Sequence, residues 1–349
     1  MRILFISGRE PTYIRNRLIL KALKSQAEVV EITSHSPNFM VRNLSVLVKF
    51  LLNRSSYDLL FVGFYGHPLM LWLRPLTRKP IVFDAYLSTY DTLCFDRKWF
   101  SPQSLPGKLA FSLDKHVCHL ADRVLLDTKA HLAYFVETFG LPPQKFSVLY
   151  VGADESIFYP LPTPKEGRFS VFYHSSFGPV HGIEHIIRAA ESLRDLEIRF
   201  LIVGDGPLRP KILSMAERRG LSNVDFLGWV PLSQLPTLIA QASICLGGHF
   251  SDSAKARRVI ATKTYQFLAM AKPTIVGDNV ANRELFTHRR EVYMCPPADG
   301  EALAQAILEL KEDEALRREI AREGYLLFKR RCGMEAIARE LQKIMEATL

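Results

Sequence analysis

Short apolar runs alternate with helical stretches along nearly the whole chain, and this alternation limits the fold more than any single motif does. Arg2–Ser7 (RILFIS) has the pattern of a buried strand, Tyr13–Ser25 that of a basic helix, and Ala27–Ile32 that of the next strand. A strand, a helix and a second strand in this order form a parallel pair joined by a crossover helix. The sequence therefore predicts an α/β protein built on parallel sheets.

The same alternation continues through both halves of the chain. In the first half we expect strands at Leu59–Gly63, Pro80–Asp84, Arg123–Asp127 and Phe146–Tyr150 and a helix at Leu105–Ala121. In the second half we expect strands at Phe169–Tyr173, Arg199–Val203, Val224–Leu227 and Ile244–Leu246 and helices at Gly182–Leu193, Leu208–Gly220 and Leu232–Gln241. The stretch Pro160–Gly167 (PLPTPKEG) has no apolar period, so it predicts a domain boundary. Because open parallel sheets bind ligands beyond the carboxyl ends of their strands, the site is expected in a cleft between two domains.

Composition excludes several classes of protein. The chain has 349 residues, of which 48% are hydrophobic and 23% charged, so it can bury a sizeable core and is not disordered. The five cysteines are far apart and form no CxxC pair, which predicts buried thiols in a reducing compartment rather than a zinc site or a disulfide framework. The apolar stretch at the N-terminus is too short for a signal peptide, and no run approaches the roughly 20 residues of a membrane span. We therefore expect a cytoplasmic protein.

Positive charge is concentrated near the N-terminus. Of the formal net charge of +9, residues 1–54 carry +6, from nine Lys or Arg against three Glu. The segment Asn38–Arg54 has no acid, and on a helix Arg42, Ser45, Lys49 and Asn53 fall on one narrow stripe with apolar side chains over the rest. Two interpretations stay open: a crossover helix packed on both sides, or a helix that lies in a membrane interface. The second predicts binding to an anionic membrane surface without spanning it.

The segment Lys263–Pro273 (KTYQFLAMAKP) indicates a nucleotide site. It has the composition of a helix that ends at Lys-Pro and leads into the apolar run Thr274–Asp278 (TIVGD), which is one half of a Rossmann-like unit. The first turn of such a helix is where the unit holds an anion or a ribose. The alternative is an ordinary α/β helix whose Lys and Gln are incidental.

Six motifs occur in one order along the chain. They are VGADESIFYP (151–160), HGIEHIIRAAESL (181–193), FLIVGDGPL (200–208), VDFLGWVP (224–231), KTYQFLAMAKPTIVGD (263–278) and PPADGEALAQAILEL (296–310). In this order the chain resembles the nucleotide-sugar-dependent retaining glycosyltransferases of GT-B fold, of the group 1 or family 4 type. The resemblance implies two Rossmann-like domains facing across a cleft: an acceptor domain over 1–162, to which a C-terminal helix at about 331–349 crosses back, and a donor domain over 163–330. It implies transfer of a sugar from a nucleotide-sugar donor to a glycan or lipid-linked acceptor, with no metal cofactor and no nucleic-acid partner.

The chain departs from the family at four positions. The family usually has an Arg and a Lys after the first strand of the donor domain to neutralise the donor diphosphate, where this chain has Ser176 and His181. The family also has two Glu separated by seven residues, where this chain has Arg258 and Gln266. The amide of Gln266 can still hydrogen-bond a ribose hydroxyl.

Other basic residues could replace the two missing cations. Lys255 and Arg258 in the run KARR, together with Lys263 and the amides of the helix that begins near Thr262, are expected to bind the donor phosphates. A solvated basic loop is the simpler interpretation of these residues. A non-catalytic nucleotide-binding or glycan-binding relative is the competing class, whereas a nicotinamide oxidoreductase is disfavoured because no GxGxxG follows the first strand.

The resemblance also places further candidate residues. Candidates for donor binding are Gly8, Arg9, His174, Gly204 and the backbone of Gly228, Trp229 and Val230. Candidates for catalysis or acceptor contact are Asp84, Tyr86 and Asp91, of which Tyr86 is near the place where the family often has a His. Capping of a helix or turn explains either aspartate equally well. The sugar, the base and the acceptor depend on a few side chains that one sequence does not locate.

Overall fold

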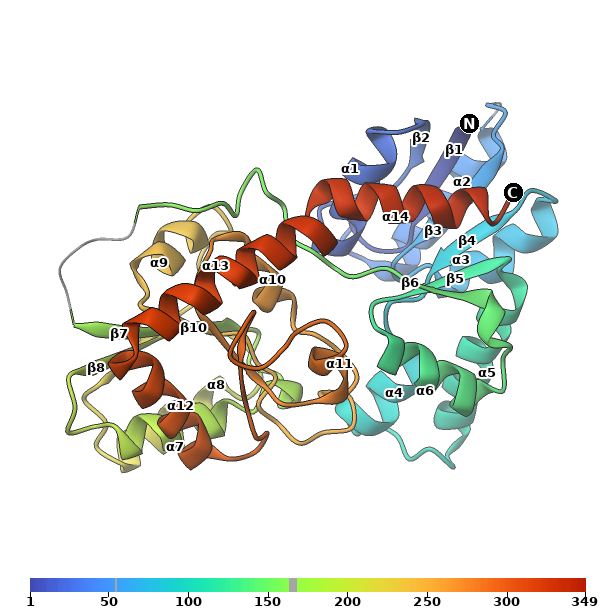
Figure 1. Cartoon of the computed structure of the whole chain (residues 1–349). Coiled ribbons are helices and arrows are strands. Elements are labelled where there is room, and N and C mark those ends of the chain that lie inside the picture. Colours follow the sequence, from blue (N-terminus) through green and yellow to red (C-terminus); the bar gives the residue numbers. More distant parts are fainter. Residues whose placement is uncertain (54, 163–167) are drawn as a thin grey trace. The chain divides into compact units, whose positions relative to one another are not determined.

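The computed structural model describes residues 1–53, 55–162 and 168–349. The chain forms two compact units, Met1–Val151 with Met334–Leu349, and Gly152–Gly333 (Figure 1). Each unit is built on a six-stranded parallel sheet, as the alternating pattern predicts. The chain leaves the first unit at Val151, before the proline-rich stretch that we took as the boundary, and positions 163–167 of that stretch lie outside the described residues.

The sheet of the first unit has the strand order β2-β1-β3-β4-β5-β6. Its strands are β1 (Arg2–Ser7), β2 (Glu28–Ile32), β3 (Leu59–Gly63), β4 (Ile81–Asp84), β5 (Arg123–Leu126) and β6 (Phe146–Val148). Its helices are α1 (Ile14–Lys24), α2 (Phe39–Leu52), α3 (His67–Leu73), α4 (Thr89–Asp91), α5 (Leu105–Leu120), α6 (Lys129–Phe139) and α14 (Met334–Glu346). The strands are apolar along most of their length because helices cover both faces of the sheet.

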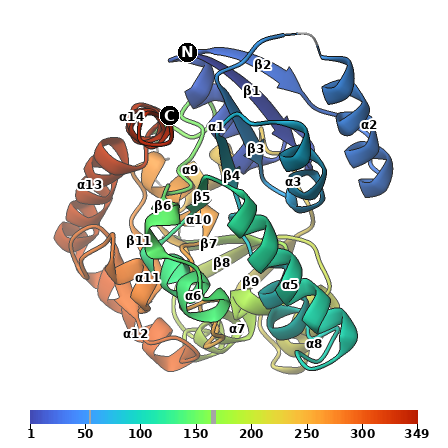
Figure 2. The ribbon, with the colours of Figure 1, turned by 90° about the vertical axis from the view of Figure 1, so that its right-hand side faces the viewer.

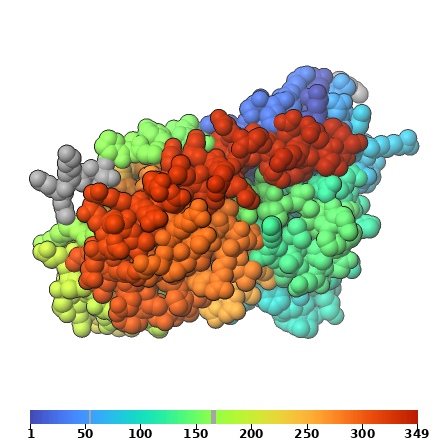
Figure 3. Space-filling model, in the orientation of Figure 1, coloured from blue at the N-terminus to red at the C-terminus, as the bar shows by residue number. Residues whose placement is uncertain are grey.

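The sheet of the second unit has the order β12-β11-β10-β7-β8-β9. Its strands are β7 (Phe169–Ser175), β8 (Ile198–Gly204), β9 (Val224–Leu227), β10 (Ile244–Leu246), β11 (Thr274–Gly277) and β12 (Tyr293–Cys295). Its helices are α7 (Ile183–Ser192), α8 (Arg209–Arg218), α9 (Leu235–Gln241), α10 (Thr262–Ala269), α11 (Val280–Arg283), α12 (Gly300–Glu312) and α13 (Glu314–Arg331). In Figure 3, α12 and α13 (orange to red) form part of the outer surface of this unit.

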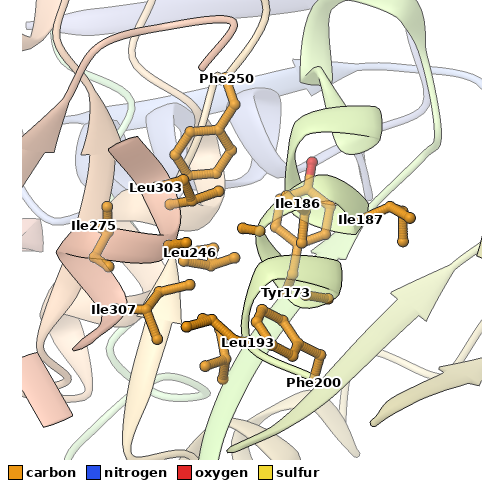
Figure 4. Close-up of a cluster of buried hydrophobic side chains, with 14 of the residues drawn as sticks. Tyr173, Ile186, Ile187, Leu193, Phe200, Leu246, Phe250, Ile275, Leu303 and Ile307 are labelled. Carbon is orange, nitrogen blue, oxygen red and sulfur yellow. The ribbon is translucent and has the colours of Figure 1, made fainter. Parts of the chain in front are cut away.

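One apolar cluster joins the sheet of the second unit to α7 and α12 (Figure 4). Tyr173 and Leu246, from the neighbouring strands β7 and β10, pack with Ile186 of α7 and Ile307 of α12. Phe250, four residues beyond Leu246, continues the same cluster. The core therefore holds the carboxyl ends of β7 and β10 and the segments that follow them.

The exposed face of α2 is apolar. Its outward residues are Met40, Val41, Leu44, Val48, Leu51 and Leu52, each 46–68% exposed. Arg42 faces inward instead: its Nε donates to the Gly8 carbonyl (2.9 Å) and its NH1 to Glu10 Oε1 (2.7 Å). Figure 2 shows α2 (blue) at the outer edge of the first unit. The helix is therefore not packed on both sides, and Arg42 does not share an outward stripe with Lys49.

The C-terminal helix α14 packs against α1 of the first unit. Ile337, Leu341, Ile344 and Met345 are buried with apolar residues of α1 and of the sheet. These positions recur every three or four residues, which places them on one face of a helix. Residues at the end of the chain therefore complete a core that begins at β1.

We predict that Leu341→Ala lowers the free energy of unfolding by roughly 2–5 kcal/mol, because it empties a fully buried position in this core. Glu335→Ala, on the exposed face of the same helix, should change it by less than about 0.5 kcal/mol. Urea denaturation followed by circular dichroism measures both. Deletion from Gly333 onward should unfold the first unit, and a truncated chain with unchanged stability would contradict this role.

Candidate functional site

The most distinctive polar cluster lies at the carboxyl ends of β7 and β10. The chain passes from β7 to β8 and β9 on one side and later returns to β10 on the other, so these two strands flank the topological switch point of the sheet. In open parallel sheets this is where ligands bind. His174 lies near the end of β7, and His249 follows β10 after two glycines. Sequence reasoning named His174 but not His249.

Lys263 is buried beside these histidines. It lies in the first turn of α10, is 5% exposed, and its Nζ lies 4.7 Å from the centre of the Tyr173 ring. Among the described residues no carboxylate or other acceptor pairs with its ammonium group. Burial lowers the pKa of Lys263 to about 7. A buried amine without a counter-charge is costly to the fold, and such groups are typical of functional sites.

Two imidazoles lie in contact next to Lys263. His181 Nδ1 is 3.3 Å from His249 Nδ1, and Ser176 Oγ is 3.3 Å from His181 Nε2. Desolvation lowers the pKa of both histidines well below the usual value, and the charge of Lys263 lowers it further. Desolvation and Lys263 also lower the pKa of His174 to about 3. All three imidazoles are therefore neutral at pH 7, near which the Lys263 amine titrates.

Gln266 adds an unsatisfied amide to the same edge of the sheet. It lies three residues after Lys263 on α10, and it is 6% exposed. Neither its Oε1 nor the Nε2 of His174 has a hydrogen-bond partner of good geometry among the described residues, although the Gln266 side chain acts on the His174 ring and opposes the lowering of its pKa. A buried acceptor without a donor is destabilising unless a ligand supplies one, and a hydroxyl group is a suitable donor.

The loop between β10 and α10 brings further positive charge. Lys255 is half-buried there, and its charge lowers the pKa of both His181 and His249. Arg258 is also half-buried, with its backbone N–H bonded to the Lys255 carbonyl (3.0 Å). Of the basic residues named from the sequence, Lys255 and Lys263 thus lie close enough to lower the pKa of His181 and His249.

Gly204 and the segment after β9 lie farther along the same edge. Gly204 ends β8 with φ of +126°, and a Cβ there would lie 1.9 Å from the Ser175 carbonyl oxygen, so only glycine fits. Its N–H donates to the Gly228 carbonyl (3.1 Å), which fixes the segment after β9. Trp229 is 74% exposed, and Val230 follows it. These backbone groups lie on the β9 side of the edge, two strands from β7.

In the first unit, Gly8 and Arg9 follow β1 at the switch point between β1 and β3. A Cβ at Gly8 would lie 2.0 Å from the Tyr65 carbonyl oxygen, so the close approach of these two loops requires glycine. The Arg9 guanidinium lies over the rings of Tyr13 and Tyr65, at 5.3 and 5.7 Å from their centres. It also pairs with Glu10 (2.9 Å). Arg9 is thus held at the carboxyl edge of the first sheet.

Asp84 is engaged in a buried ion pair. Its two carboxylate oxygens accept from Arg15 Nε (3.0 Å) and NH2 (2.9 Å), and Arg15 also donates to the Leu149 carbonyl (2.8 Å). Burial raises the pKa of Asp84, and Arg15 opposes this effect. The Arg15 guanidinium lies over the Tyr86 ring at 5.1 Å. This arrangement favours a structural role for Asp84, which joins β4 to α1 and to the segment after β6.

Asp91 lies near a second buried network, which sequence reasoning did not predict. The Asp91 N–H donates to Ser88 Oγ (2.9 Å), and Ser88 Oγ donates to Asp114 Oδ2 (2.6 Å). His67 Nε2 lies 3.4 Å from Asp114 Oδ1, and burial lowers the pKa of His67. His67 and Ser88 line a small pocket of about 40 Å³ beyond the ends of β3 and β4. The available signal was a polar residue soon after each of two adjacent strands.

We predict that Asp84→Asn destabilises the first unit by roughly 3–5 kcal/mol, because it leaves the Arg15 charge buried and poorly paired. The double variant Arg15→Met with Asp84→Leu should lose less, since no charge stays buried. Urea denaturation of the three proteins gives the comparison. If Asp84→Asn keeps full stability and loses only activity, Asp84 is a catalytic residue as the resemblance implied.

Comparison with known proteins agrees with this geometry. Residues 168–313 match the family described as glycosyl transferases group 1. A putative colanic acid biosynthesis glycosyl transferase of Escherichia coli (strain K12) is 31% identical over 117 residues, which are 34% of this chain and 27% of that protein. A lipopolysaccharide core biosynthesis glycosyltransferase of Rhizobium meliloti (strain 1021) is 27% identical over 179 residues, 51% of this chain and 49% of that protein. The matched stretches thus span half or less of these two curated relatives.

A solved structure resembles the whole chain. The Anabaena protein HepE in complex with UDP and glucose superimposes with a TM-score of 0.75 at 18% identity, over 99% of this chain and 100% of that one. At this identity the likeness shows the fold alone, which is GT-B. The second unit therefore matches the group 1 glycosyltransferases and the two parallel sheets have the GT-B fold, so the resemblance stated from the sequence is confirmed.

Proposed function

We propose that this protein is a retaining glycosyltransferase that moves a sugar from a nucleotide-sugar donor to a glycan or lipid-linked acceptor. The observation that carries the proposal is a pair of buried groups at the switch point of the second unit. Among the described residues, no acid acts on the Lys263 amine and no donor of good geometry bonds the Gln266 amide oxygen. A relative in colanic acid synthesis, another in lipopolysaccharide core synthesis, and a GT-B neighbour that binds UDP and glucose support it. Synthesis of cell-surface polysaccharide or glycolipid is the setting that these relatives favour.

Each group in the cluster has a role that its chemistry suits. Gln266 accepts from a ribose hydroxyl, and Lys263 with Lys255 and Arg258 binds the diphosphate. The main chemical task is to stabilise the negative charge that develops on the departing diphosphate, and positive groups fixed in a desolvated site do this well. The proposed chemistry requires no metal. In the first unit, Tyr86 and the pocket beside Asp91 are the candidate contacts for the acceptor.

A non-catalytic nucleotide-binding or glycan-binding relative is the second candidate. Ser176, His181 and Arg258 favour it, because they occupy positions where the family usually has two cations and an acid. Hydrolysis or transfer of a nucleotide sugar separates the two candidates. Binding without turnover, across a panel of donors and acceptors, would support the non-catalytic one.

We predict that one of the UDP, GDP, ADP or CMP sugars raises the thermal melting temperature and is consumed by the purified protein. Gln266→Ala should weaken binding of that donor roughly 5–10-fold, since one hydrogen bond is worth about 1 kcal/mol. Gln305→Ala, on the exposed surface of α12, is the matched control. A protein that binds none of these donors would refute the proposed function.

The protein is also proposed to work at an anionic membrane surface. The six outward apolar side chains of α2 fall within one helical face of roughly 120°, from Met40 to Leu52. Lys49 is exposed at the border of that face, and no acid occurs between Asn38 and Asn53. Such a face can enter the lipid interface while basic groups contact anionic headgroups. No helix of the described residues is long and apolar enough to cross a membrane.

We predict that vesicles containing anionic lipid bind the protein and that salt weakens the binding. The triple variant Met40→Gln, Leu44→Gln, Leu51→Gln should bind at least roughly 100-fold more weakly, since each buried apolar side chain is worth about 1.5–3 kcal/mol. Val280→Gln, at an exposed apolar position of the second unit, should bind normally. Vesicle sedimentation at low and high salt measures this, and wild-type protein that ignores anionic vesicles would refute it.

Charge substitutions in and near α2 differ in what they test. Arg42 is buried and bonded to Glu10, so Arg42→Glu tests folding rather than membrane binding. Arg54 lies outside the described residues. Lys49→Glu is the informative substitution, because this side chain is exposed and bonds only a backbone carbonyl, that of Thr33 (2.8 Å).

A further inference from the structure

An amine and two imidazoles meet at the switch point of the second unit, and no acid of the described residues acts on them. Lys263 lies in the first turn of α10, His249 after β10 and His181 after β7, so three separate elements bring them together. Contacts at 3.3 Å join His181 to His249 and to Ser176. The Lys263 ammonium lies 3.9 Å from the position that a Cβ on Gly248 would take, so it points toward the turn after β10.

The surroundings of this cluster are neutral or positive. From β7 it faces the Tyr173 ring and His174, and from the loop before α10 it faces Lys255. The carboxylate of that loop, Asp252, is paired with Arg257. No acid of the described residues acts on Lys263, His181 or His249. An anionic ligand would therefore supply the negative charge that balances the Lys263 ammonium group.

We propose that Lys263, His181 and His249, with the Ser176 hydroxyl, form a diphosphate-binding site that takes up a proton as the diphosphate binds. This proposal rests on the proposed function, in which the ligand is a nucleoside diphosphate. The two neutral imidazoles and Ser176 form a hydrogen-bonded chain with one another. The donors left for a ligand are the three N–H groups of the protonated Lys263 amine and one N–H or O–H at an end of that chain, which suits a group with several phosphate oxygens. In the family that the chain resembles, an Arg and a Lys usually neutralise the donor diphosphate. Here a protonated Lys263 would neutralise it instead.

Proton uptake follows from the burial of the cluster. In the ligand-free protein, desolvation makes the charged forms costly, so Lys263 is mostly neutral at pH 8. The negative charge of a bound diphosphate stabilises the protonated amine, and the complex therefore holds a proton that the free protein lacks. Affinity should fall as pH rises through and above about 7, where free Lys263 loses its proton. The terminal phosphate of UDP titrates near pH 6, below this window.

Isothermal titration calorimetry with the whole chain tests the proposal. UDP is titrated at pH 8 in buffers of different ionisation enthalpy, which gives the number of protons exchanged, and inorganic pyrophosphate is titrated for its affinity alone. We expect uptake of up to one proton, and a fall in affinity approaching roughly tenfold per pH unit between pH 7.5 and 9. Zero uptake in the wild-type protein would overturn the proposal.

Substitutions at Lys263 separate charge from structure. Lys263→Arg keeps a charge at every pH in this range, so it should bind the diphosphate without proton uptake. Lys263→Met should bind at least roughly tenfold more weakly and melt at a higher temperature, because an apolar side chain replaces a buried unpaired amine. Lys211→Met, at an exposed position of α8, is the matched control and should change neither property.

The outcomes distinguish this site from the proposed function. If Lys263→Met binds UDP as tightly as wild type while sugar transfer is observed, the site proposal fails and the glycosyltransferase stands. If pyrophosphate binds and Lys263→Met weakens that binding, but no nucleotide or nucleotide sugar binds, the site stands and the glycosyltransferase fails. If neither UDP nor pyrophosphate binds, the site proposal is overturned.

Discussion

Parallel strand pairing is the constraint on which both units depend. It brings the carboxyl ends of all strands in a sheet to one edge, and the order of strands then decides which two loops diverge there. In the first unit these loops follow β1 and β3, and in the second they follow β7 and β10. The cluster of Lys263 and the imidazoles lies at this point of the second unit and Arg9 at that of the first, whereas the network of Asp84 lies one strand farther along, at the end of β4. The order of short apolar strands and crossover helices thus determines the position of the ligand site, and the side chains at that position determine its chemistry.

The uncompensated cluster of the second unit is stable because rigid apolar groups hold it. The centre of the His174 ring lies 5.9 Å from that of Phe172 and 5.5 Å from that of Phe267. The apolar core next to them includes Leu246 and Phe250. These contacts offset the desolvation of a buried amine and its imidazole neighbours. The buried polar groups that would bind a ligand at this edge therefore lower the stability of the ligand-free protein, which is common in binding sites.

Much of the fold follows from local pattern. The expected strand bounds differ from the observed ones by at most two residues, and Val224–Leu227 and Ile244–Leu246 agree fully, because a buried strand is a short apolar run bounded by turn residues. The site is only partly predictable. Lys263 and Gln266 stand in a recognisable helix, whereas the contact of His181 with His249 joins residues 68 apart and depends on strand order. The pairing of Asp84 with Arg15 depends likewise on where α1 crosses the sheet.

The orientation of α2 shows what the sequence pattern leaves open. The pattern allowed a helix packed on both sides or one with an outward apolar face, and it did not show that the Arg42 guanidinium is buried against the Gly8 carbonyl and Glu10. Charge-assisted hydrogen bonds to fixed acceptors can outweigh the cost of burying a guanidinium, and they then fix the rotation of the helix. Because Arg42 points inward, the apolar face from Met40 to Leu52 must point outward. The exposed apolar surface is therefore a consequence of an ion pair at the carboxyl edge of β1, the same edge that carries Arg9.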